Sequence, residues 1–181
     1  MIVVDVGCAR YGGDYSIERL IEEFRPDALW GFDPSPEPFA WAASTGAGHY
    51  GTYEVVVDEC PVYVVGRAAW TFTGEIPFVR GGLGGHVADA EEAGAEMVSC
   101  FDLAEFILAD LTQPEIVLKI DAEGAEYPLL EHLIAEEADV RLKLVWVEWH
   151  GSSNAEENER RAAQRADIEE RIRCPIMEWR W

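Results

Sequence analysis

Two stretches of sequence decide the fold of this chain: Ile2-Val3-Val4-Asp5-Val6-Gly7 and Ile116-Val117-Leu118-Lys119-Ile120-Asp121. Each is short, rich in β-branched residues and almost wholly apolar, which is typical of strands buried on both faces of a parallel sheet. Each run has an acid at or near its end, with a glycine close behind. Because ligands of open α/β sheets bind beyond the carboxyl ends of the strands, we expect four carboxylates near that edge: Asp5, Asp121, Glu123 and Glu126.

A third run, Ala28 to Phe32, has the same apolar character and is followed by Asp33. A carboxylate at the end of the second strand is the usual acceptor for the two hydroxyls of a ribose. The order of strand, glycine-containing loop, helix, strand and acid therefore indicates a site for a ligand that contains adenosine. This pattern alone leaves the identity of that ligand open.

The loop after the first strand, Gly7 to Gly13, narrows the choice of ligand. It fits neither the GxGxxG pattern of dinucleotide-binding proteins nor the GxxxxGK[ST] pattern of phosphate-binding loops. An adenosine ligand without phosphates fits better, and S-adenosylmethionine is the commonest such cofactor. The alternative is an ordinary turn between strand and helix that needs glycine for its backbone angles.

Several stretches together resemble the FkbM family of S-adenosylmethionine-dependent methyltransferases. The main ones are VVDVGCARYGGDYS (Val3–Ser16), GFDPSPE (Gly31–Glu37) and LKIDAEGAEYPLL (Leu118–Leu130). Shorter supporting pieces lie at 68–78, 100–107 and 147–151, and the whole set follows the family's order. KIDAEGAE is the most specific of these motifs, whereas the first loop of this chain is longer than is usual in the family.

The resemblance implies an α/β fold with a Rossmann-like class I methyltransferase sheet. Its strand order would be 3-2-1-4-5 plus an edge strand, with helices on both faces. A chain of 181 residues is expected to form a single domain, residues 1–181. The cofactor site would be formed by the first loop and by the ends of the second and fourth strands. Its members would be Asp5, Gly7, Cys8, Gly13, Tyr15, Ser16, Asp33, Pro34 and Asp121.

Further elements are expected from apolar periodicity and from capping and turn residues. Helices are expected at about 14–24, 36–44, 126–135 and 154–173, and strands at about 53–58, 61–65, 142–149 and 176–181. After a turn at Thr73-Gly74, residues 75–79 are expected to pair with the preceding segment as a hairpin. Asp102 and Glu105 have the spacing of a capping box. Residues 88–96 are acidic and show no regular pattern.

Methyl transfer to an oxygen needs a close approach of the acceptor and a group that removes or masks its proton. Catalytic candidates lie beyond the fourth and fifth strands: Asp121, Glu123 and His150, with Glu148 beside them. Adjacent strands are ~4.8 Å apart, so these side chains can converge. Each candidate has a structural alternative. Asp121 could fix the following turn, Glu123 could favour the next helix through its dipole, and His150 could be a partly buried strand-end residue.

Carboxylates with one imidazole would also suit Mg or Mn. Some O-methyltransferases on this fold hold a metal at these two strand ends. The sequence has no two-histidine spacing and no dedicated set of metal ligands, so a required metal is not favoured and no metal ligands are assigned.

The charge balance limits the partners. Thirty-five acidic residues against 14 basic ones give a net charge of −21, whereas a nucleic-acid binder needs a cationic surface. No apolar run approaches the ~20 residues of a membrane span. The N-terminus shows no signal-peptide pattern, and the four cysteines are far apart. We therefore expect a cytoplasmic protein with reduced thiols and with neither nucleic-acid nor membrane partners, and its oligomeric state stays open.

The sequence thus favours an S-adenosylmethionine-dependent O-methyltransferase. The resemblance implies a small-molecule or glycan acceptor, namely a hydroxyl of a sugar, glycan or natural product. One alternative is a methyltransferase that acts on a nitrogen, a carboxyl or a protein group. The other is a cofactor-binding module without catalysis, which would serve as a scaffold.

Overall fold

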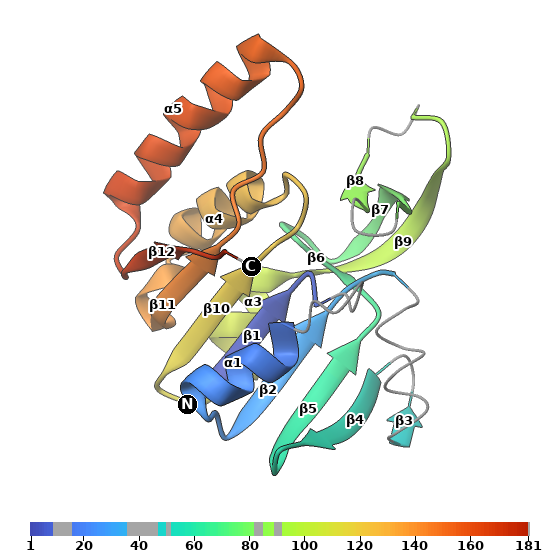
Figure 1. Ribbon diagram of the computed structural model, residues 1–181, viewed down its shortest axis with the longest axis vertical. Helices are drawn as coiled ribbons and strands as arrows, with labels where there is room; N and C mark the ends of the chain where they lie inside the picture. The colour runs from blue at the N-terminus through green and yellow to red at the C-terminus, as the bar shows by residue number, and fades with distance from the viewer. Residues whose placement is uncertain (9–15, 36–46, 50–51, 82–84, 89–91, 181) are drawn as a thin grey trace.

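The computed structural model describes residues 1–8, 16–35, 47–49, 52–81, 85–88 and 92–180. They form a mixed α/β fold with one large sheet, one small sheet and helices (Figure 1). In this described part of the chain, the large sheet has eight strands in the order β12-β11-β10-β1-β2-β5-β4-β3. Their bounds are β1 (Ile2–Val6), β2 (Ala28–Phe32), β3 (Ala47–His49), β4 (Thr52–Val57), β5 (Cys60–Val65), β10 (Ile116–Ile120), β11 (Leu142–Val147) and β12 (Ile176–Glu178).

The strands that surround β1 run parallel to one another. β5, β2, β1, β10, β11 and β12 are all parallel neighbours, and β4 and β3 extend the sheet antiparallel beyond β5. Every residue of β1 and β10 is buried, as their continuous apolar runs predict. The two strands pair in register, with Asp5 opposite Lys119. Their carboxyl ends therefore lie side by side at one edge of the sheet.

Helices cover both faces of the large sheet. α1 (Ser16–Phe24) covers one face, where its buried residues pack with Val3 of β1. The opposite face, which includes Val4, packs against α3 (Leu103–Glu105), a π-helical turn (Phe106–Asp110) and α4 (Glu126–Ala135). α5 (Ala155–Arg171) lies beyond α4 (Figure 1). Successive side chains along each strand point to opposite faces of the sheet and thus pack in two separate apolar cores.

The small sheet lies beside the carboxyl edge of the large one (Figure 1). Its order is β6-β9-β7-β8, with β6 at Ala68–Trp70, β7 at Gly74–Val79, β8 at His86–Val87 and β9 at Ala95–Asp102. The predicted hairpin between residues 75–79 and the preceding segment is wrong. Both β6 and β7 pair with β9 instead, β6 parallel and β7 antiparallel. The central place of β9 lets it bury Val98 and Cys100 against Ile76 of β7.

Other predicted elements can be compared directly. α4 begins and ends where the sequence predicts, whereas α5 ends at Arg171 and β11 at Val147, each two residues before the predicted end. Asp102 does cap α3 by accepting from the Glu105 N–H, but its own N–H donates to Thr73, so only half of the capping box forms. The predicted helix at 36–44 lies outside the described residues. Among those described, no helix is both long and apolar enough to cross a membrane.

Candidate active site

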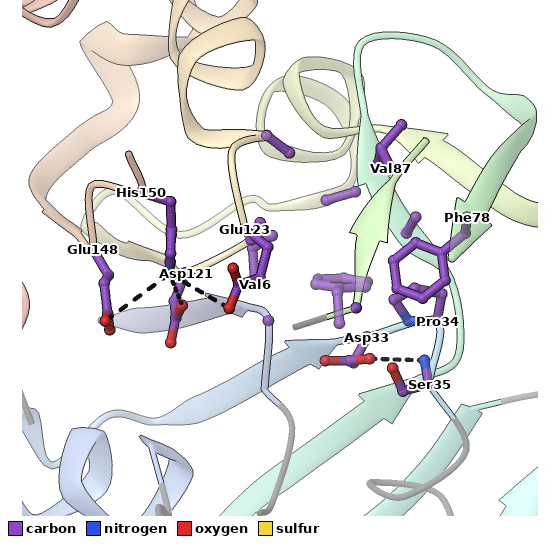
Figure 2. Close-up of a pocket in the computed structure, with 17 residues that line it drawn as sticks. Val6, Asp33, Pro34, Ser35, Phe78, Val87, Asp121, Glu123, Glu148 and His150 are labelled. Carbon is purple, nitrogen blue, oxygen red and sulfur yellow. Dashed lines mark hydrogen bonds and ion pairs between the residues drawn. The ribbon is translucent and has the colours of Figure 1, made fainter. Parts of the chain in front are cut away.

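A cavity of about 290 Å³ lies beyond the carboxyl ends of β1, β2, β10 and β11 (Figure 2). Strand-end residues of the large sheet form one part of its wall, and Phe78 and Val87 of the small sheet form another. Seven residues that the sequence singles out line it: Gly7, Asp33, Pro34, Asp121, Glu123, Glu148 and His150. The position of the cavity agrees with the rule that ligands of such sheets bind at their carboxyl edge.

Gly7 lets the chain leave β1 close to the end of β10. Its φ is +79°, and a Cβ at this position would lie 1.7 Å from the carbonyl oxygen of Asp121. Its N–H donates to the carbonyl of Phe32 at 2.9 Å. Glycine is therefore required both for the backbone angle and for the close approach.

Asp33 lies at the end of β2 and is buried. Its Oδ1 accepts a hydrogen bond from the N–H of Ser35 at 2.7 Å (Figure 2). Burial raises the pKa of this carboxyl to about 6, although the hydrogen bonds from Ser35 oppose that shift. Asp33 is thus a buried acid in the cavity wall whose ionisation is sensitive to what binds beside it.

Three predicted cofactor residues lie behind this wall rather than in it. Asp5 is fully buried, accepts from Ser16 Oγ at 2.6 Å and forms an ion pair with Lys119. Cys8 is also buried, and burial raises the pKa of its thiol well above the ordinary value. Contact between these side chains and a cofactor stays a prediction. Two further predicted members, Gly13 and Tyr15, lie outside the described residues.

The ring of His150 is held by Glu126 at the start of α4. Glu126 is fully buried, and its carboxylate accepts from the backbone N–H groups of Ala122 and Gly124. Nδ1 of His150 lies 2.8 Å from Oε1 of Glu126. Because a carboxylate can only accept, we assign the proton of this bond to Nδ1. The other ring nitrogen, Nε2, is therefore the one directed toward the cavity.

Three carboxylates surround Nε2 of His150 (Figure 2). It lies 3.7 Å from Oδ1 of Asp121, 3.6 Å from Oε1 of Glu123 and 4.0 Å from Oε1 of Glu148. Burial alone would lower the pKa of the imidazole. The hydrogen bond with Glu126 and the charges of the neighbouring acids outweigh burial and raise the pKa to about 9. The ring thus favours its charged form at neutral pH.

The same strand ends offer a set of metal ligands. Asp121, Glu148 and His150 each offer one ligand atom, and these atoms lie within 4.8 Å of one another. Two carboxylates and an imidazole suit Mg or Mn. Glu126 would then support the set from behind, because a carboxylate that binds the second nitrogen of a histidine fixes the ring for metal ligation.

The main chain at His150 is fixed by two residues that the sequence analysis did not single out. The hydroxyl of Tyr127 donates to the carbonyl of His150 at 3.1 Å. Nη1 of Arg161, from α5, donates to the same carbonyl at 2.9 Å and to that of Gly151 at 3.0 Å. The sequence carries one available signal for Arg161, its place in a charged helix just after the strand-end histidine, but that pattern is equally typical of a solvated helix face.

The chain was compared with protein-family models, with curated proteins and with solved structures. A family model described as the methyltransferase FkbM domain matches residues 8–172. The chain belongs to the FkbM methyltransferase family. The matched residues leave out β1 and Gly7 but include the other residues of the site, and the match shows that the chain has a methyltransferase domain. Methyltransferase families generally use S-adenosylmethionine as the methyl donor, so membership of the family implies this cofactor. No curated protein and no solved structure matches this FkbM chain.

Proposed function

We propose that this FkbM domain is an S-adenosylmethionine-dependent O-methyltransferase that acts on a hydroxyl of a sugar, glycan or natural product. One observation carries the proposal: a single cavity is lined both by the second-strand acid Asp33 and by the acid–histidine group around His150. The first feature suits an adenosine ligand and the second suits removal of a proton. We also equate β5, β2, β1, β10 and β11 with strands 3-2-1-4-5 of a class I methyltransferase sheet, and β12 with its edge strand.

Asp33 and the Gly7 loop would hold the cofactor. The carboxylate of Asp33 would accept from the ribose hydroxyls, and the backbone that follows Gly7 would approach the amino-acid end. S-adenosylmethionine supplies the methyl group from a sulfonium centre. The acids at the ends of β10 and β11 give the cavity a negative potential, which favours a cationic ligand.

His150, Asp121 and Glu123 would act on the acceptor. Nε2 of His150 would receive the hydroxyl proton as the acceptor oxygen takes the methyl group in line, with S-adenosylhomocysteine as the leaving group. Asp121 and Glu123 lie close enough to stabilise the imidazolium that results. The ring must first release the proton it favours at neutral pH, and positive charge from a sulfonium in the same cavity promotes that release, because like charges repel.

The convergence of Asp121, Glu148 and His150 favours a second route for the same reaction. If Asp121, Glu148 and His150 held a divalent cation, the ion would supply Lewis-acid activation of the acceptor hydroxyl, and the proton would leave to water rather than to His150. The two routes share Asp121 and His150, but the first uses Glu123 and the second uses Glu148. Turnover measured before and after chelator treatment, with Mg or Mn added back, distinguishes them.

Calorimetry with S-adenosylmethionine and S-adenosylhomocysteine tests the cofactor, with NAD as the control ligand. We expect binding of the first two and none of NAD; selective binding of NAD would overturn the proposal. A donor-turnover screen over sugars, glycans and phenols then tests the acceptor. Turnover on amines, carboxylates or proteins alone would favour a methyltransferase of another class, and cofactor binding without any turnover would favour a scaffold.

A further inference from the structure

Lys119 is a fully buried lysine in the middle of the sheet. It lies on β10 among apolar residues, on the face covered by α1. Its Nζ donates to the carbonyl of Gly7 at 2.9 Å. It also lies 3.0 Å from Oδ1 of Asp5 and 3.3 Å from Oδ2 of Asp121. One ammonium group therefore contacts the end of β1, the loop that follows it and the end of β10.

Packing alone gives no reason for a charge at this position. Buried ion pairs contribute little net stability, because desolvation of the two charges offsets their attraction, and an apolar residue of similar volume often serves as well. Every other residue of β10 is apolar and buried. The role of the charge therefore depends on the groups that the ammonium group contacts.

The ammonium group holds two parts of the cavity wall. The Gly7 carbonyl belongs to the loop assigned to the cofactor, whereas Asp121 is among the residues that the proposed function assigns to the acceptor. With Oδ2 of Asp121 fixed by Lys119, Oδ1 is the oxygen turned toward Nε2 of His150. An apolar side chain at 119 would leave both parts without a donor.

We propose that Lys119 is a positioning residue that fixes together the Gly7 carbonyl, where the loop assigned to the cofactor begins, and the orientation of Asp121. The proposal rests on the proposed function, since it assigns both walls to one reaction. The competing view is that Lys119 only neutralises Asp5, its partner across the strands. The two views predict different affinities for S-adenosylmethionine when Asp5 and Lys119 are both replaced by neutral residues.

The test compares Asp5→Asn with the double variant Asp5→Asn/Lys119→Met. In both variants residue 5 is neutral, so no Asp5 charge is left buried without its partner. Only the double variant also lacks the ammonium group that contacts Gly7 and Asp121. Thermal unfolding reports on the fold, and calorimetry with S-adenosylmethionine reports on the cofactor loop. Lys143→Met, which changes an exposed lysine on the neighbouring β11, is the matched control and should resemble the parent in both measurements.

We expect the double variant to unfold within a few degrees of Asp5→Asn, yet to bind S-adenosylmethionine about tenfold more weakly or worse. Equal affinity of the two variants would overturn the positioning role while leaving the proposed function intact. A parent protein that binds no S-adenosylmethionine would overturn both. Should the double variant fail to fold, Asp5→Asn/Lys119→Gln keeps a neutral donor near Gly7. Failure of that variant as well would make Lys119 a folding residue and overturn the proposal.

Discussion

The carboxylate of Glu126 lies 2.8 Å from Nδ1 of His150 and thereby determines which ring nitrogen faces the cavity. The contact joins the first residue of α4 to the segment that follows β11. It is shielded from solvent, because Glu126 is fully buried. The same carboxylate closes the turn that carries Asp121 and Glu123, through the N–H groups of Ala122 and Gly124.

Glu126→Gln should therefore impair function more than folding. Glutamine keeps one acceptor oxygen for the turn but no longer holds the ring with a charge. We expect turnover to fall about 10–100-fold, as is usual when the partner behind a functional histidine is lost. Glu136→Gln, on an exposed residue just after α4, is the control. An unchanged turnover rate for Glu126→Gln would show that Glu126 has no role in catalysis. Glu126→Ala should also lose ~1–3 kcal/mol of stability for each backbone N–H left without an acceptor.

Replacement of Asp33 by alanine should weaken cofactor binding. A charged acceptor for the ribose is lost, at a cost of ~1.5–3 kcal/mol, so the dissociation constant should rise by about one to two orders of magnitude. Calorimetry with S-adenosylmethionine measures the change. Asp27→Ala removes an exposed acid that pairs with the chain's N-terminus and should have no effect on affinity. The ribose assignment would not survive if both variants bound like the parent.

Cofactor affinity should depend on pH through Asp33. Burial raises the pKa of this carboxyl to about 6, and ribose hydroxyls donate best to its ionised form. Affinity should therefore increase as pH rises and level off above 6, with binding at pH 5 about tenfold weaker than the plateau. The effect on stability has the opposite sign: the raised pKa stabilises the fold fully below 3.8, and this contribution is lost as pH rises through about 6. Asp33→Asn should flatten the binding profile, and a profile with the same slope in that variant would assign the dependence to another group.

Asp121→Asn and His150→Ala should separate catalysis from binding. Both side chains line the cavity, and the proposed function assigns them to the acceptor, so most of the affinity for S-adenosylmethionine should remain while turnover falls ~10²–10⁴-fold. The assay needs an acceptor from the product screen. Parent-like rates in both variants would move the chemistry elsewhere, most simply to Glu123. A loss of folding in Asp121→Asn would instead favour a structural role in the turn before α4.

The protein should not retain duplex DNA or RNA at physiological salt. Its net charge of −21 repels phosphates, and no counterion release can offset that repulsion without a basic surface. A gel-shift assay across a range of salt concentrations measures this directly. Binding that weakens steeply as salt increases is the result that would contradict the expectation.

The strand-end residues could be predicted because one local pattern specifies them. A buried parallel strand reads as a continuous apolar run, and the residue after it must lie at the carboxyl edge. Asp33 and Asp121 follow from that pattern, and His150 from its place after β11. All three line the cavity.

What the sequence could not give depends on contacts between distant segments. β9 begins inside an acidic stretch, and its exposed Glu96 and Met97 hide the alternation that starts at Val98. The sequence places Glu126 near the carboxyl edge of the sheet, but it does not show that this carboxylate contacts His150, 24 residues away. Lys119 interrupts an apolar strand, and only the register with β1 shows that Asp5 lies opposite it.

The cavity wall is shared between two sheets of different chemical character. The large sheet contributes the acids and the histidine, whereas the small sheet contributes Phe78 and Val87, which are apolar. Under the proposed function, selection during evolution could therefore act on the two sheets separately. Substitutions in β7 and β8 would change the apolar part of the cavity wall, while the strand ends that carry the acids and the histidine stay unchanged. Such a division would let a lineage reshape its cavity without losing the side chains proposed to carry out the reaction.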